Sequence, residues 1–205
     1  CGQGYPPSWV LRQHGIPVSL SVDTSVWFSS DLFSAMRSTL GADRGMEHLK
    51  AHEKGDTVTH SHLRAEHVVD WATRGGAATL GPGDIVGSLQ PGKRADIVLI
   101  KNDRSPSMFP IVNPNGHIAL QASRGDVHTV LVNGKVAKAD GRLLEDLAPV
   151  HKQIADTVEY LQRELGEDAW NQGMNPDIPE AKVLDNPYTY TDYRSTSTHS
   201  LRPEI

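Results

Sequence analysis

Asp23 is the residue whose type and position best suit catalysis. It ends a segment with the two-residue period of a β-strand, in which apolar side chains alternate with small or polar ones: Ile16, Val18, Leu20 and Val22. Residues 6–14 predict a short helix before it, with Gly15 as the left-handed stop. In barrels of alternating strands and helices, catalytic side chains project from the C-terminal ends of the strands. Asp23 is therefore a candidate catalytic residue, although an aspartate that caps a helix or lies in a loop gives the same local pattern.

His60 and His62 are the next candidates, as a pair of metal ligands. On a strand, their i, i+2 spacing would direct both imidazoles to one side, as a metal pair needs. However, residues 48–56 are polar, and residues 63–66 predict the first turn of a helix. The spacing from His62 to His67 also matches neither metalloprotease helix pattern. We therefore interpret the pair as part of a solvated loop or a helix start.

Cys1 allows two further kinds of chemistry. It could be an autoprocessed nucleophile whose own amine serves as base, or the acylated first residue of a bacterial lipoprotein. Neither role explains the rest of the chain. As the single cysteine it excludes an internal disulfide, so a reducing compartment is the default and we expect a cytoplasmic protein.

The overall composition excludes several classes of partner. The 205 residues include 20 Lys+Arg and 25 Asp+Glu, which gives a formal net charge of −5. This mixed, slightly acidic balance offers no electrostatic surface for nucleic acid or an anionic membrane. No apolar run approaches the ~20 residues that span a bilayer. A mean hydropathy of −0.42 instead fits a globular protein with a polar surface.

The first half of the chain predicts alternating helices and strands. Ser29, Ser30 and Asp31 offer a cap for a helix that begins at residue 32. Residues 41–62 predict a connection with some helix, and residues 63–80 predict a helix that ends at Gly81. Helix, strand and helix with short connections indicate an α/β fold.

The second half changes in character. Residues 84–147 predict mostly β-structure, with strands at 85–89 and 95–100 around a Pro91-Gly92 turn, and a hairpin at Asn133-Gly134. An amphipathic helix then follows from an apolar series at helical spacing: Val150, Ile154, Val158, Leu161 and Leu165. The tail from Gly166 lacks a period and predicts an extended arm.

Several stretches of the chain carry a family resemblance. Residues 15–23 followed by 31–37 are similar to a last barrel strand and its following helix. Residues 72–98 are similar to an exit from that barrel into a small β-sandwich, and residues 130–143 to the closing strands of the sandwich. In these stretches the sequence resembles the amidohydrolase superfamily, and within it the cytosine deaminase-like and triazine hydrolase-like branch. The resemblance covers roughly residues 5–165.

The resemblance implies a fold and a domain plan. The expected fold class is α/β: the C-terminal end of a (β/α)8 metal-dependent hydrolase barrel, part of a small β-sandwich and a C-terminal helix. Residues 1–83 would supply the last strand and helices of the barrel, residues 84–147 the sandwich strands, and residues 148–205 the amphipathic helix and tail.

The resemblance also implies a reaction. Members of this superfamily use a divalent metal to activate water and hydrolyse C–N bonds, here those of a heterocyclic or similar amine. Asp23 corresponds to the aspartate that contacts the metal and passes a proton to the leaving nitrogen. The metal would be zinc, with iron or manganese also compatible with a carboxylate ligand. The superfamily's His-x-His strand and further metal histidines have no counterpart here, so the isolated chain is expected to be inactive.

An incomplete barrel leaves sheet edges and apolar faces exposed. We therefore expect this chain to be ordered beside a missing N-terminal barrel portion or through self-association, with a homo-oligomer as the expected state and a small molecule as substrate. The alternative is a non-catalytic, β-rich binding or oligomerisation module that binds no metal.

Overall fold

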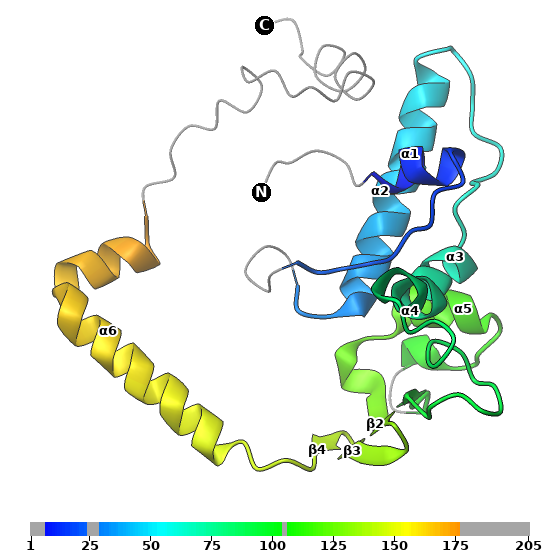
Figure 1. The fold of residues 1–205 in the computed structure, drawn as a ribbon. Coiled ribbons are helices and arrows are strands. Elements are labelled where there is room, and N and C mark those ends of the chain that lie inside the picture. Colours follow the sequence, from blue (N-terminus) through cyan, green and yellow to red (C-terminus); the bar gives the residue numbers. More distant parts are fainter. Residues whose placement is uncertain (1–6, 24–28, 104–105, 177–205) are drawn as a thin grey trace, which may run out of the picture. The chain divides into compact units, whose positions relative to one another are not determined.

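The protein is described by a computed structural model that covers residues 7–23, 29–103 and 106–176 (Figure 1). The chain divides into two compact units, with the boundary between Leu144 and Glu145. Among the described residues, the first unit holds the sheet and every helix but one, and the second holds the remaining long helix.

The N-terminal helices largely follow the sequence signals. Helix α1 (Ser8–Gln13) is followed by Gly15, whose φ of 64° confirms the predicted left-handed stop. Helix α2 (Leu32–His52) begins at the predicted cap and runs to residue 52, well into the stretch expected to be a connection with some helix. The helix continues because Met46 remains on its buried side, so packing outweighs the low helix propensity of the glycines in that stretch.

Asp31 caps α2 through several hydrogen bonds. Its Oδ1 accepts the Ser34 N–H at 2.8 Å, and its Oδ2 accepts the Ser29 hydroxyl at 2.9 Å and the Ser34 hydroxyl at 3.2 Å. Burial alone would raise the pKa of Asp31, but these bonds and the charge of Arg37 together lower the pKa below its usual value of 3.8. The ionised cap therefore stabilises the fold at neutral pH.

We expect Asp31→Ala to lower the free energy of unfolding by about 1 kcal/mol at pH 7. Because the folded-state pKa lies below the unfolded value, this contribution is complete above pH 3.8 and is lost as the pH falls through the folded-state pKa. Urea titrations at pH 7 and pH 3 should show the difference between wild type and variant shrinking in acid. Asp56→Ala, in an exposed loop, serves as the control and should show no such change.

The second group of helices forms one nearly continuous rod. Helix α3 (Ala65–Asp70) leads into a π-helical turn (Trp71–Gly75) and then into α4 (Gly76–Leu80). Gly81, with a φ of 101°, ends the rod and confirms the predicted stop. Helix α3 packs on α2 around an apolar core formed by Met36, Leu40, Leu63, Ala65, Val68 and Ala119.

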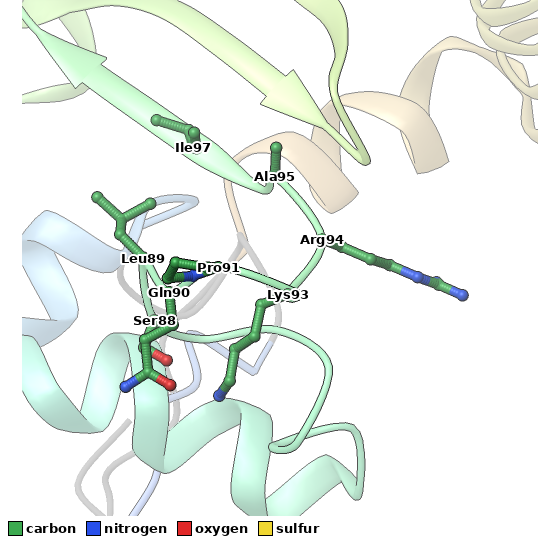
Figure 2. Close-up of a pocket in the computed structure, with 8 residues that line it drawn as sticks. All are labelled: Ser88, Leu89, Gln90, Pro91, Lys93, Arg94, Ala95 and Ile97. Atoms are coloured by element: carbon green, nitrogen blue, oxygen red, sulfur yellow. The ribbon is translucent and has the colours of Figure 1, made fainter.

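The predicted strand at residues 85–89 is absent, and this expectation was wrong. Gly87 turns there with a φ of 90°, and a Cβ on it would lie 2.7 Å from that of Ala77. The Lys93 ammonium fixes the same connection by donating to the carbonyls of Gly83 at 2.7 Å and Val86 at 3.3 Å. Lys93 lines an open hollow of about 250 Å³. Figure 2 shows the residues around it: Ser88, Leu89, Gln90, Pro91, Lys93, Arg94, Ala95 and Ile97.

Four antiparallel strands form the sheet, in the order β1-β2-β3-β4. They are β1 (Ile97–Ile100), β2 (Val127–Val132), β3 (Lys135–Ala139) and β4 (Arg142–Leu143). The hairpin at Asn133-Gly134 is confirmed, with positive φ values of 50° and 79° as a type I′ turn requires.

The expectation of mostly β-structure over residues 84–147 was too broad. Between β1 and β2 the chain forms short helical elements: Pro106–Met108, α5 (Pro114–Gly116), the π-helical turn His117–Gln121 and Arg124–Asp126. The buried Ala119 belongs to the helical core, so packing against α2 and α3 holds this part away from the sheet.

The second unit consists of helix α6 (Ala148–Met174), which confirms the predicted amphipathic helix. Gly166 interrupts it with φ 76° and ψ 164°, and the chain is helical again up to Met174. The expectation of an extended arm from Gly166 was therefore wrong for residues 167–174. The rest of that arm, residues 177–205, lies outside the described residues. Within the described part of the chain, no helix combines the length and apolarity needed to cross a membrane.

Candidate functional site

The segment that carries Asp23 is extended but is not a strand. Residues 16–23 belong to no sheet, and residues 17–23 make no backbone–backbone hydrogen bond to any other described residue. The strand prediction was therefore wrong at the level of hydrogen bonding, because a ladder needs a neighbouring strand. The predicted two-residue period is nevertheless seen in solvent exposure, because half-buried and exposed side chains alternate along the segment. The half-buried ones are Val18, Leu20 and Val22.

Asp23 lies at the exposed end of this segment. Its backbone has a φ of 56°, and its N–H donates to the Ser21 hydroxyl at 3.0 Å. A positive φ is uncommon for a residue with a side chain, and aspartate is among the types that tolerate it. Thr24 and the next four residues lie outside the described part of the chain.

The helical rod holds the segment from one side. Leu20 packs on the core cluster, and the Val18 carbonyl approaches the rod so closely that a Cβ on Gly75 would lie 2.5 Å from that oxygen. The position of Asp23 therefore depends on contacts between its segment and the rod.

We expect Gly75→Ala to destabilise the protein by about 1–3 kcal/mol, because the new methyl group would displace the Val18 carbonyl. Gly45→Ala is the matched control, since the Cβ there meets no atom within 4 Å and α2 would gain about 0.5–1 kcal/mol of helix propensity. Urea unfolding followed by circular dichroism measures both. Equal shifts in the same direction would contradict this contact.

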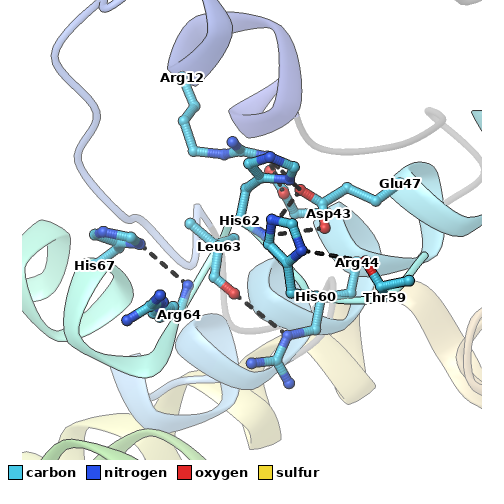
Figure 3. A network of polar contacts seen from close by, with 10 residues as sticks. All are labelled: Arg12, Asp43, Arg44, Glu47, Thr59, His60, His62, Leu63, Arg64 and His67. Carbon is cyan, nitrogen blue, oxygen red and sulfur yellow. Dashed lines mark hydrogen bonds and ion pairs between the residues drawn. The ribbon is translucent and has the colours of Figure 1, made fainter.

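A buried ion network joins α1 to α2 (Figure 3). The Arg12 guanidinium donates to Asp43 Oδ1 at 2.9 Å and to Glu47 Oε1 at 3.0 Å. The side chains of Asp43 and Glu47 are only 0% and 3% exposed. Burying two carboxylates around one guanidinium costs desolvation free energy. The arrangement is stable only while the opposite charges of these three groups compensate one another.

His60 and His62 lie in the loop before α3, as expected. Their ring centres are 5.1 Å apart, and the His62 Nδ1 lies 3.0 Å from Glu47 Oε1 (Figure 3). The His62 N–H also donates to Glu47, at 3.2 Å from each oxygen. Among the described residues, no three His, Cys, Asp or Glu side chains group in a way that could hold a metal ion. Through His62, the loop therefore joins the ion network at Glu47.

Asp43 and Glu47 were missed by sequence reasoning, although a signal was present. Both stand at helical spacing from the core residues Met36 and Leu40, on one continuous stripe of α2. Carboxylates on the apolar stripe of a helix indicate a buried cation partner. That partner, Arg12, belongs to an element predicted only as a short helix before the strand.

The model of the amidohydrolase family matches residues 5–137, which include Asp23, the helical rod and most of the sheet. A 5-methylthioadenosine/S-adenosylhomocysteine deaminase from Desulfitobacterium hafniense is 36% identical over 153 residues, covering 74% of this chain and 32% of the relative. An S-triazine hydrolase from Gordonia rubripertincta is 31% identical over 138 residues, covering 67% of this chain and 27% of the relative.

A solved structure shows the same fold. The adenosine deaminase from Xanthomonas campestris, crystallised with bound zinc, superposes with a TM-score of 0.63 at 24% identity, covering 77% of this chain and 33% of that one. The chain thus spans about a third of the length of the curated relatives it matches. These matches confirm the resemblance seen in the sequence and the α/β metal-dependent hydrolase fold. With its match over residues 5–137, this chain belongs to the amidohydrolase family.

Proposed function

We propose that this chain is the C-terminal part of a metal-dependent amidohydrolase that hydrolyses a C–N bond of a heterocyclic or similar small-molecule amine. The observation that carries the proposal is Asp23, which ends an extended segment packed on helices inside the family-matched region. The names of the relatives support a deaminase-type reaction, since one is a deaminase of adenosine derivatives and another a triazine hydrolase.

Within this proposal each part of the chain has a task. Residues 1–83 supply the last strand and helices of the barrel, residues 84–147 part of a small β-sandwich, and residues 148–205 the C-terminal helix and tail. The half-buried alternation of residues 18–22 supports the first assignment, because such a segment can join a ladder without turning its apolar side chains to water. A single cysteine favours the cytoplasm as its compartment.

The proposed metal is a divalent cation, with zinc favoured by the bound zinc of the Xanthomonas structure. The described residues hold no complete site, because they bring no three suitable side chains together and a catalytic zinc takes three protein ligands. Asp23 suits the role of one ligand: its carboxylate is exposed and makes no ion pair with another described residue. When bound, the metal would acidify the attacking water.

Asp23 itself would carry the proton. A carboxylate beside the attacking water can accept its proton and then donate it to the leaving nitrogen, which departs as ammonia or an amine. No described residue places a positive charge against this carboxylate, so its lone pairs remain available for the metal and the proton. The other metal ligands would lie in the two thirds of the relatives' length that this chain does not span.

The test compares this chain with the longer polypeptide that contains it. For both, we measure the zinc content by elemental analysis and the intact mass of every chain present. We also measure the release of ammonia from adenosine-type and triazine amines. We expect little zinc and no ammonia for the 205-residue chain, and both for the longer polypeptide. Stoichiometric zinc in the isolated chain would contradict the incomplete site and favour His60 and His62 as ligands. A zinc-loaded longer polypeptide that releases no ammonia from any heterocyclic amine would overturn the proposed reaction.

A further inference from the structure

The backbone before Asp23 is fixed by the serine two residues earlier. The Asp23 N–H donates to the Ser21 hydroxyl at 3.0 Å, which is the only hydrogen bond that Asp23 makes to another described residue. A serine hydroxyl that accepts from a nearby N–H closes a local turn in place of a regular ladder bond. The bond therefore holds the peptide plane between Val22 and Asp23, from which the aspartate side chain is carried.

Ser21 stands where the packed part of the segment ends. The Val18 carbonyl lies against the rod at Gly75, and Leu20 is the last residue of the segment that packs on the core cluster. Ser21 follows Leu20 directly, and residues 17–23 make no backbone–backbone hydrogen bond to any other described residue. Through its hydroxyl, Ser21 thus carries the fixed position of Leu20 on to Asp23.

Neither Ser21 nor Asp23 is held by burial. Both side chains are exposed, so packing within the described part of the chain does not set the direction of the carboxylate. That direction depends on the peptide plane held by Ser21 and on the φ of 56° at Asp23 itself. Loss of the Ser21 acceptor would free the plane to rotate, and the carboxylate would move with it.

The reaction makes this position matter. In the proposed function, one carboxylate accepts a proton from the attacking water and returns it to the leaving nitrogen, so it must lie within hydrogen-bond reach of both. A displacement of about 1 Å at a reacting group can cost about a hundredfold in rate. A single local hydrogen bond is thus enough to affect turnover.

We propose that Ser21 is a positioning residue for Asp23, whose hydroxyl holds the backbone that aims the catalytic carboxylate. The inference rests on the proposed function, because it assigns Ser21 a task only through Asp23. Ser21 itself exchanges no proton with the substrate.

Kinetics of the longer polypeptide test the catalytic consequence. Ser21→Ala should lower kcat about 3–10-fold, the contribution of one net hydrogen bond, and leave KM within about twofold. Ser21→Thr keeps the hydroxyl and should restore the rate. Ser19→Ala is the matched control, since Ser19 is an exposed serine of the same segment that makes no hydrogen bond to another described residue. A Ser21→Ala rate equal to that of Ser19→Ala would overturn the inference.

A double-mutant cycle separates positioning from a general structural role. In an Asp23→Asn background no proton is carried by residue 23, so Ser21→Ala should lower the remaining rate no further. An equal loss in both backgrounds would overturn the inference. A full wild-type rate for Asp23→Asn alone would instead overturn the proposed function, and the role of Ser21 with it.

The contact itself is measured on the 205-residue chain, without reference to any reaction. The NMR order parameter of the Asp23 N–H reports its fast backbone motion. We expect it to be lower in Ser21→Ala than in wild type, Ser21→Thr and Ser19→Ala. An order parameter unchanged by Ser21→Ala would show that the hydroxyl does not hold this peptide plane, and would overturn the inference whatever the enzyme hydrolyses.

Discussion

Replacing Asp23 with asparagine in the longer polypeptide is expected to lower the rate of C–N hydrolysis by about 10²–10⁴-fold, the usual contribution of a positioned acid or base. Asparagine keeps the size and the tolerance of a positive φ, so the backbone at 56° should be retained. It cannot accept and return a proton. Ammonia release gives the rate, and circular dichroism with thermal melting shows that folding is unchanged.

Asp56→Asn is the control for this substitution. Asp56 is also an exposed aspartate in the same unit, but it follows α2 and lies in the loop before α3. Its replacement should leave the rate unchanged. An Asp23→Asn enzyme with the full wild-type rate would show that Asp23 is a loop aspartate, which is the alternative that the local sequence allowed.

Zinc content separates the two roles proposed for Asp23. Loss of the rate together with loss of zinc would indicate that the carboxylate mainly holds the metal. Loss of the rate with zinc retained would indicate that it mainly moves the proton.

The elements predicted correctly are those whose signals are local. The Asp31 cap, the stops at Gly15 and Gly81 and the turn at Asn133-Gly134 are each decided by a few adjacent residues, and the structure confirms all of them. A hydrogen bond from Ser34 to Asp31, or a positive φ at glycine, needs no distant partner.

The elements predicted wrongly depend on distant contacts. Residues 16–23 have the period of a strand, but a strand also needs a neighbour for its ladder, and local periodicity carries no information about the neighbour. Residues 41–62 were expected to be a connection with some helix, but α2 extends through His52, and Met46 is buried on it. Residues 106–126 form short helical elements because Ala119 joins the helical core.

The candidate site shows the same division. Asp23 could be selected because its position at the end of an apolar period is a local feature. The ion network could not be assembled, because Arg12 stands 31 residues from Asp43 and 35 from Glu47, and only the packing of α1 on α2 brings them together.

Removing the cation from this network is expected to have the largest effect on stability. Arg12→Met keeps most of the length of the side chain but leaves Asp43 and Glu47 buried together without their guanidinium. Breaking a buried pair by removing one partner costs about 3–5 kcal/mol, because the remaining charge keeps its desolvation penalty. Urea unfolding of the 205-residue chain at pH 7, followed by circular dichroism, measures this loss.

Two comparisons show whether burial is the cause. Arg74→Met removes a guanidinium from an ion pair with Asp70 in which the arginine side chain is 70% exposed, so its cost should stay below about 1 kcal/mol. The triple variant Arg12→Met, Asp43→Leu, Glu47→Met replaces the guanidinium and both carboxylates with apolar groups. It also removes the Glu47 acceptor of His62, whose side chain is 64% exposed and can turn to water, so it should still recover most of the stability lost by Arg12→Met alone. If the triple variant is no more stable than Arg12→Met, then desolvation of the two carboxylates contributes little to the stability lost by Arg12→Met. The attraction between the charges would then be what holds α1 to α2.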